Sequence, residues 1–151
     1  MIKLSLKDWI DVQLVGLLRQ DARQSIAELA RQLKMSGPSV SERLKRQEEH
    51  GAIRGYTPEL DWPQWGYTLQ AIVRLRPLPG QLKALEARIN ATPQFTECDK
   101  VTGEDCYIAH LLLRDIGQLD DILDGFAELA TTVTSIVKAS PVLRRLPPLL
   151  P

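Results

Sequence analysis

Two short amphipathic runs on either side of a turn with glycine and proline constrain the fold of this chain more than any other feature. They lie in "ELARQLKMSGPSVSERLKR", residues 28–46, where Met-Ser-Gly-Pro interrupts the helical pattern. Apolar residues recur at helical spacing before and after the turn, at Ile26, Leu29, Ala30, Leu33, Val40 and Leu44. This spacing predicts a helix-turn-helix, although an αα-corner that only packs against the chain shows it too.

The second helix of this pair has two possible starting points. Ser36 is a suitable N-cap, because Gly37 and Pro38 then occupy the first turn, where a missing N–H costs little. Ser39, followed by Glu42 three residues later, forms a rival capping box. The sequence therefore leaves the first residue of this helix open.

Positive charge gathers on the second helix, on the side away from its apolar residues. The helix begins with small uncharged side chains, which can approach base edges, and its basic residues follow where phosphates would lie. This pattern predicts a surface that binds double-stranded DNA. The candidate residues are Ser36, Gly37 and Pro38 at the helix start, Ser39, Ser41, Glu42 and Lys45 for the bases, and Arg43, Arg46 and Arg54 for the phosphates.

The overall charge of zero hides a split between the two halves of the chain. Residues 1–58 contain 10 Lys and Arg and 7 Asp and Glu, a net charge of +3, so the remainder carries −3. A hydrophobic content of 44% is enough for one or two folded domains. No apolar run approaches the roughly 20 residues that span a bilayer, and signal-peptide features are missing at the N-terminus. We therefore expect a cytoplasmic protein that does not contact a membrane.

The stretch "YTPELDWPQWG" separates two units, because prolines and a glycine interrupt the periodicity there. The segment "AIRGYTPEL", residues 52–60, which overlaps the beginning of this stretch, is able to continue as a strand or wing. We expect a helix-turn-helix domain at 1–52, a linker or hinge strand at 53–66 and a second domain at 67–151.

The second domain alternates strand and helix patterns in the order βαββαβ. The expected strands are 68–76, 95–101, 106–113 and 132–143, and the expected helices are 81–89 and 119–129. This order is the ferredoxin-like split βαβ pattern, so the fold class is α+β. The strand at 106–113 is apolar on both faces, and the simplest cover for its second face is another copy of the chain. We therefore expect a homodimer, with assembly of dimers into a higher oligomer left open.

Taken together, the first unit resembles the DNA-binding domain of the Lrp/AsnC (feast/famine) family of transcription regulators. The matching residues are Leu6, Asp11, "QDAR" at 20–23, "ELA" at 28–30, Ser36, "RLKR" at 43–46, "EEHGAIRGY" at 48–56 and Gly66. The resemblance covers nearly the whole chain and implies a RAM-type αβ-sandwich as the C-terminal domain, which dimerises through its sheets and senses amino acids. Gln47 departs from the leucine that is usual in the family, so it needs partial exposure or a hydrogen-bond partner.

The resemblance also implies an effector site at the turn between the hairpin strands. Its residues are Thr102, Gly103, Glu104, Asp105 and Cys106, with Thr134 and Ser135 from the last strand. Main-chain amides beside Gly103 would bind the carboxylate of an amino acid, and Glu104 or Asp105 its ammonium group. Cys106 stands where the family usually has an aspartate, so we expect altered amino-acid selectivity.

The two cysteines are not expected to form a disulfide. Cys98 faces Ala109 if the hairpin turn has two residues and Ile108 if it has three, so neither register places it opposite Cys106. Cys106 is open to two interpretations, a small buried apolar side chain or a redox sensor.

Enzymatic constellations are missing from the sequence. It has only two histidines, His50 and His110, and no P-loop, glycine-rich nucleotide turn or metal-ligand spacing, so we expect no cofactor and no metal. The sequence therefore predicts a sequence-specific DNA-binding regulator, not an enzyme, modulated by an amino acid or a related metabolite. Two alternatives share this architecture: a protein like the sirohaem decarboxylases, whose aromatic signature is missing here, and a metabolite sensor that does not bind DNA.

Overall fold

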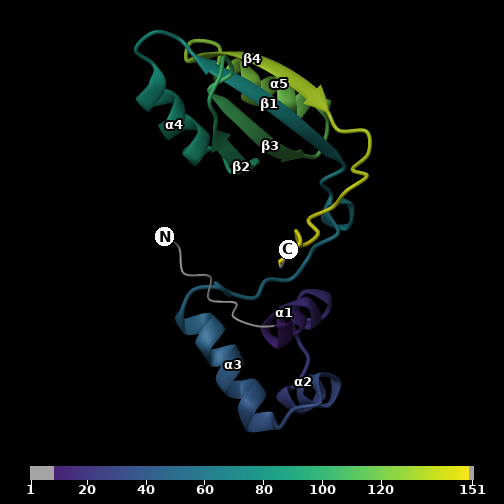
Figure 1. Cartoon of the computed structure of the whole chain (residues 1–151). Helices are drawn as coiled ribbons and strands as arrows, with labels where there is room; N and C mark the ends of the chain where they lie inside the picture. Colours follow the sequence, from purple (N-terminus) through teal and green to yellow (C-terminus); the bar gives the residue numbers. More distant parts are fainter. Residues whose placement is uncertain (1–8, 150–151) are drawn as a thin grey trace. The chain divides into compact units, whose positions relative to one another are not determined.

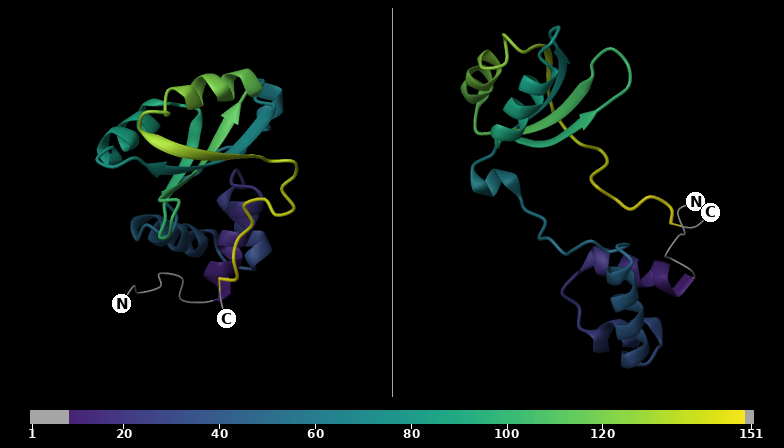
Figure 2. Two further views of the ribbon diagram at one scale, coloured as in Figure 1. Left: turned by 90° about the horizontal axis from the view of Figure 1, so that it is seen from above. Right: turned by 90° about the vertical axis from the view of Figure 1, so that its left-hand side faces the viewer.

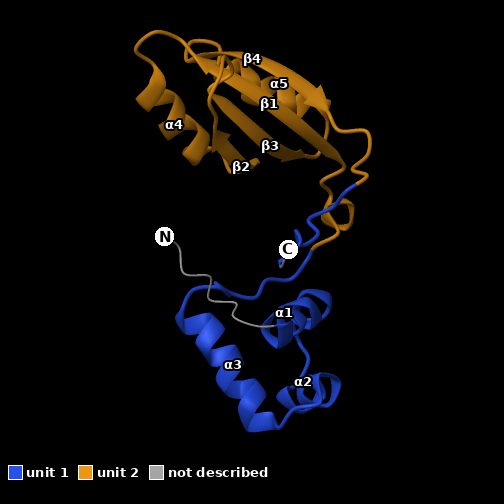
Figure 3. Ribbon diagram, in the orientation of Figure 1, with its two compact units in different colours: residues 1–59, 142–151 blue, residues 60–141 orange. Residues whose placement is uncertain are grey.

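The computed structural model describes residues 9–149 and divides the chain into two compact units (Figure 3). Unit 1 comprises Met1–Glu59 together with Val142–Pro151, and unit 2 comprises Leu60–Pro141. The C-terminal segment thus groups with the N-terminal helices rather than with the sheet. The expected limits of 1–52, 53–66 and 67–151 remain predictions.

The described part of unit 1 contains three helices, α1 (Trp9–Gln20), α2 (Ile26–Leu33) and α3 (Gly37–Glu49) (Figure 1). Their apolar stripes meet in one small core, since burying these stripes is what stabilises helices of this length. The buried apolar residues are Leu14, Leu18, Leu29, Ala30 and Val40. The helices α2 and α3 contain the two amphipathic runs of the predicted helix-turn-helix.

Ser36 is the N-cap of α3. Its Oγ accepts a hydrogen bond from the Ser39 backbone N–H at 3.3 Å, and Pro38 lies in the first turn. The alternative start at Ser39 is therefore wrong, because that residue already has a place inside the first turn. Upstream, Lys34 ends α2 in the left-handed conformation, with φ at 53°. Two helices joined by three residues form the expected helix-turn-helix.

The segment between α3 and the sheet contains no strand among its described residues, so the expected strand or wing is wrong. Its regular structure is a short 3₁₀ helix, η1 (Trp62–Trp65), which Gly66 ends with φ at 84°. Prolines at 58 and 63 remove backbone donors that a strand would need.

Unit 2 is built from β1 (Leu69–Pro77), α4 (Leu82–Ala91), β2 (Phe95–Lys100), β3 (Tyr107–Leu113), α5 (Ile116–Asp124) and β4 (Ala130–Ile136). The sheet order is β2-β3-β1-β4, and all neighbours are antiparallel. This topology confirms the ferredoxin-like prediction and the α+β class. The helix α5 begins earlier than the expected 119–129 because Asp115 caps it by accepting from the Gln118 N–H at 2.9 Å.

The helices α4 and α5 lie on one face of this sheet (Figure 2). Alternate residues of β1 and β3 point toward them and form the core of unit 2. No helix of unit 2 covers the other face, which we call the open sheet face. Its central side chains are Ile72 on β1, Ile108, His110 and Leu112 on β3, and Val133 on β4.

The helices of the described chain include none that is long and apolar enough to cross a membrane. The strands β2 and β3 set Cys98 opposite Ala109, which is one of the two expected registers. Both cysteines are free thiols, as predicted.

Candidate nucleic-acid and effector sites

The exposed face of α3 carries most of the predicted base-reading residues. Ser41, Glu42 and Lys45 are exposed, and Lys45 pairs loosely with Glu49 at 3.6 Å between Nζ and Oε1. Ser39 is half-buried and accepts a hydrogen bond from the Ser36 hydroxyl at 2.8 Å. The start of the helix, including Pro38, is small and uncharged. This face is therefore free of bulky side chains at its N-terminal end, and further along it carries charges of both signs, with Lys45 between Glu42 and Glu49.

Arg43 and Arg46, predicted to bind phosphates, both reach the carboxylate of Asp11 on α1. The Arg43 Nη1 lies 2.9 Å from Asp11 Oδ1, and the Arg46 Nη2 lies 3.4 Å from Oδ2. Asp11 is fully buried, whereas the side chains of Arg43 and Arg46 remain 21% and 39% exposed. The sequence interpretation missed this ion triad. It makes Arg43 chiefly a partner of Asp11 and leaves Arg46 the more accessible of the two.

The burial of Asp11 could have been predicted from its spacing to the apolar residues of α1. Residues 11, 14 and 18 fall on one side of a helix, and Leu14 and Leu18 belong to the apolar stripe. A carboxylate on that stripe requires basic partners, because burying an unpaired charge is costly. Gln47 is also fully buried. Of the two expectations for this residue, partial exposure or a hydrogen-bond partner, partial exposure is therefore wrong.

Arg54, the last of the predicted phosphate ligands, is exposed in the segment that follows α3. Two residues later, the Tyr56 hydroxyl donates a hydrogen bond to Glu48 Oε1 of α3 at 2.7 Å. Partial desolvation of the Tyr56 hydroxyl, followed by its bond to Glu48, raises the pKa of Tyr56 to about 12, although the side chain remains 49% exposed. This contact ties the segment that carries Arg54 to the last turn of α3.

The predicted effector turn forms the loop between β2 and β3, and arginines of β1 already bind its acidic residues. Arg76 donates from Nε to the Glu104 carbonyl at 2.8 Å, and its Nη2 lies 3.2 Å from the Glu104 carboxylate. Arg74 Nη1 lies 3.7 Å from Asp105 Oδ2. Arginines of β1 thus already pair with the two carboxylates that were assigned to the effector ammonium group. The sequence did not reveal these ion pairs.

The backbone of this loop turns tightly at two positions. Gly103 has φ at 107°, a conformation that suits glycine, and Cys106 has φ at 61°, which is uncommon for a residue with a side chain. Thr102 is exposed beside Gly103, whereas Cys106 is half-buried and packs against the core of unit 2. That packing agrees with the interpretation of Cys106 as an apolar side chain.

Thr134 and Ser135 of β4 point to opposite sides of the sheet. Thr134 pairs with Val73, whose side chain faces the helices, and Ser135 pairs with Ile72 on the open sheet face. Arg74 and Arg76, which bind the loop, pair further along with Val133 and Thr131. The structure therefore does not bring Thr134 together with the acidic residues of the loop.

A small polar cluster fixes the strands beside the loop. Glu86 of α4 accepts hydrogen bonds from the hydroxyl of Tyr107 and, at 3.2 Å, from Lys100 Nζ. The Tyr107 hydroxyl, followed by the Lys100 ammonium group, lowers the pKa of Glu86. Lys100 and Tyr107 are the last and first residues of the two strands that the loop connects. The cluster thus holds both ends of the loop in place.

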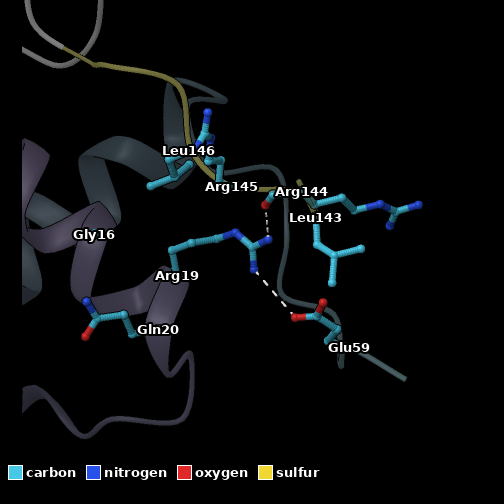
Figure 4. A pocket seen from close by; sticks show the side chains of 8 residues that line it. All are labelled: Gly16, Arg19, Gln20, Glu59, Leu143, Arg144, Arg145 and Leu146. Carbon is cyan, nitrogen blue, oxygen red and sulfur yellow. Dashed lines mark hydrogen bonds and ion pairs between the residues drawn. The ribbon is translucent and has the colours of Figure 1, made fainter. Parts of the chain in front are cut away.

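A groove of about 420 Å³ in unit 1 was not anticipated from the sequence (Figure 4). It lies between α1 and the C-terminal segment, where Arg19 pairs with Glu59 at 4.0 Å and donates to the backbone carbonyl of Arg144. Within residues 9–149, no group of three or more acidic, histidine or cysteine side chains is placed to hold a metal ion.

A helix-turn-helix with a serine-capped second helix, joined in one chain to a ferredoxin-like unit, defines a DNA-binding regulator with a separate sensing domain. The model of the AsnC-type helix-turn-helix domain matches residues 8–47, and that of the Lrp/AsnC ligand binding domain matches residues 70–147. The chain belongs to the Lrp/AsnC family of helix-turn-helix transcriptional regulators. Membership in this family favours a transcriptional regulator over the decarboxylase-like alternative.

Related transcriptional regulators match this chain along most of its length, in sequence and in fold. The transcriptional regulator Rv2324 of Mycobacterium tuberculosis is 30% identical over 147 residues, which are 93% of this chain and 97% of the relative. The solved structure of Bacillus subtilis LrpC is 27% identical with a TM-score of 0.86, covering 92% of this chain and 99% of LrpC. The feast or famine regulatory protein Rv3291c of M. tuberculosis, solved in complex with L-methionine, is 29% identical with a TM-score of 0.82, covering 92% and 97%.

Proposed function

We propose that this regulator binds double-stranded DNA with the exposed face of α3 in the major groove. Ser41, Glu42 and Lys45 read base edges, and Glu42 accepts from a cytosine amino group. Arg46 and Arg54 bind phosphates, whereas Arg43 is occupied by Asp11. The observation that carries this proposal is the Ser36-capped start of α3, which is small and uncharged and is followed by the exposed Lys45 and the partly exposed Arg46.

The β2–β3 loop is the proposed site of an amino-acid effector. A related regulator has been solved with L-methionine, and the loop of this chain offers carboxylates and a glycine with an accessible backbone. Because Arg74 and Arg76 already bind Asp105 and Glu104, the effector ammonium group competes with these arginines for the same oxygens. This competition, together with Cys106, predicts modest affinity and altered selectivity.

Two copies of the chain pair through the open sheet face in this proposal. The face is apolar at Ile72, Ile108 and Leu112, and no helix of unit 2 covers it. A two-fold pair would place two α3 helices on major grooves about 34 Å apart, or a multiple of that spacing.

The sequencing of DNA fragments that the protein retains from its own genome tests DNA binding. We expect a recurring motif with two half-sites, and we expect the Lys45→Ala variant to retain fewer of these fragments. Random recovery of fragments by the unaltered protein would favour the sensor that does not bind DNA.

Calorimetry against the twenty amino acids tests the effector site. We expect heat of binding from at least one of them, and its loss in Asp105→Ala combined with Glu104→Ala. Tight binding that survives this double change would mean that the effector binds elsewhere.

A further inference from the structure

The fully buried carboxylate of Asp11 lies beneath the helix that is proposed to face DNA, and none of the proposed DNA contacts uses it. Asp11 is in the first turn of α1, and both of its oxygens pair with arginines of α3. The partners, Arg43 and Arg46, are three residues apart and therefore neighbours on the helix surface. One acidic side chain thus controls two of the three basic side chains that α3 carries.

We infer that Asp11 is a specificity-determining residue that withholds Arg43 from DNA phosphates and limits the reach of Arg46. This inference rests on the proposed binding of DNA by α3. A guanidinium group held 2.9 Å from a buried carboxylate has its charge neutralised and its position fixed. On α3, the charge left to attract phosphates independently of sequence is then carried by Lys45 and by the exposed part of Arg46, and Arg54 adds to it from the following segment.

Asp11 would weaken the electrostatic attraction between α3 and DNA phosphates, which does not depend on the base sequence. Each basic side chain that reaches a phosphate adds to non-specific affinity and steepens its decrease with salt. Base contacts by Ser41 and Glu42 supply discrimination, so a protein with fewer phosphate contacts gains a larger ratio of specific to non-specific binding. By pairing with Arg43, the buried Asp11 increases the ratio of specific to non-specific DNA binding by α3.

The Asp11→Asn variant tests this role, because asparagine keeps the size of the side chain but removes its charge. In salt titrations of the full-length protein on a mixed-sequence DNA duplex, we expect several-fold tighter binding and a log–log salt slope steeper by about one unit. The Glu28→Gln variant is the matched control, since Glu28 also pairs with an arginine, Arg31, but on α2. It should leave the slope unchanged.

The Arg43→Gln variant gives an independent test. If Asp11 already withholds Arg43, this change should leave the salt slope of the parent protein unaltered, and it should remove most of the steepening when combined with Asp11→Asn. Circular dichroism establishes that each variant is folded. Should Asp11→Asn fail to fold, Arg43→Gln alone decides the question.

Three results would overturn the inference. The first is an Asp11→Asn variant whose salt slope equals that of the parent protein. The second is a Glu28→Gln variant whose salt slope steepens as much as that of Asp11→Asn. The third is an Arg43→Gln variant whose salt slope is flatter by about one unit, which would show that Arg43 contacts phosphate directly. Failure of the proposed DNA binding looks different, because the unaltered protein would then show no salt-dependent affinity for any duplex.

Discussion

At the scale of single residues, Ser36 stabilises the start of α3 as its N-cap. The Ser36 hydroxyl satisfies a backbone N–H that the helix itself cannot bond. Ser36→Ala should therefore lower the free energy of unfolding of unit 1 by about 1 kcal/mol. Thermal denaturation measures the change. Ser41→Ala, on the exposed face of the same helix, is the control and should alter stability little, and equal losses in both variants would contradict a role of Ser36 as cap.

Arg46 is the accessible arginine of the Asp11 triad, and its replacement tests the proposed phosphate contact. Arg46→Ala should weaken binding to all DNA sequences and flatten the log–log salt slope by about one unit. Fluorescence anisotropy at several salt concentrations provides the measurement. Lys83→Ala removes the same charge from α4 in unit 2 and serves as control. Unchanged affinity and slope in Arg46→Ala would mean that this part of α3 does not face DNA.

At the scale of elements, the hydrogen bond between Tyr56 and Glu48 fastens the segment after α3 to that helix. Partial desolvation of the hydroxyl, followed by this bond, raises the pKa of Tyr56 to about 12, above the ordinary value of about 10. The folded state therefore holds this proton more tightly than the unfolded chain. The resulting stabilisation is complete below pH 10 and is lost as the pH rises from about 10 to about 12.

Glu48→Gln should lower the pKa of Tyr56, but not to its ordinary value, because desolvation is the larger cause. A pH titration of the tyrosine ring by NMR follows this group, and Tyr56→Phe assigns the signal. Glu49→Gln changes the neighbouring carboxylate and should leave the titration where it was. A Tyr56 ring that titrates near pH 10 in the parent protein would show that the segment is detached from α3 in solution.

At the scale of the whole molecule, the open sheet face decides the proposed assembly. Leu112 lies on that face, on the same strand as Ile108, so Leu112→Lys places a charge in the proposed dimer interface. We expect the parent protein to sediment as a dimer or a larger assembly and the variant to dissociate at micromolar concentration. Ile116→Lys is the control, because this residue is 56% exposed at the start of α5, on the other side of the sheet. A parent protein that sediments as a monomer would exclude the dimer.

Local sequence signals were sufficient to predict much of the fold. The helical stripes, the serine cap and the alternation in β1 and β3 depend on residues a few positions apart, so the chain displays them directly. The βαββαβ order follows from these local patterns, whereas the register that pairs Cys98 with Ala109 was one of two that the sequence left open. The wing failed as a prediction because weak strand propensity near prolines does not decide whether a partner strand is available.

The chemistry of the candidate sites depended on contacts between residues far apart in the chain. Asp11 and Arg43 are 32 positions apart, and Arg76 and Glu104 are 28 apart, so no local pattern paired them. A residue type predicts which charges a side chain can offer, but only the packing of α1 against α3, or of β1 beside the β2–β3 loop, determines which charges remain for a ligand. The sequence therefore determined the elements and the class of protein, whereas the tertiary structure decided that Arg43 is occupied, that the loop carboxylates are paired, and that Thr134 points away from them.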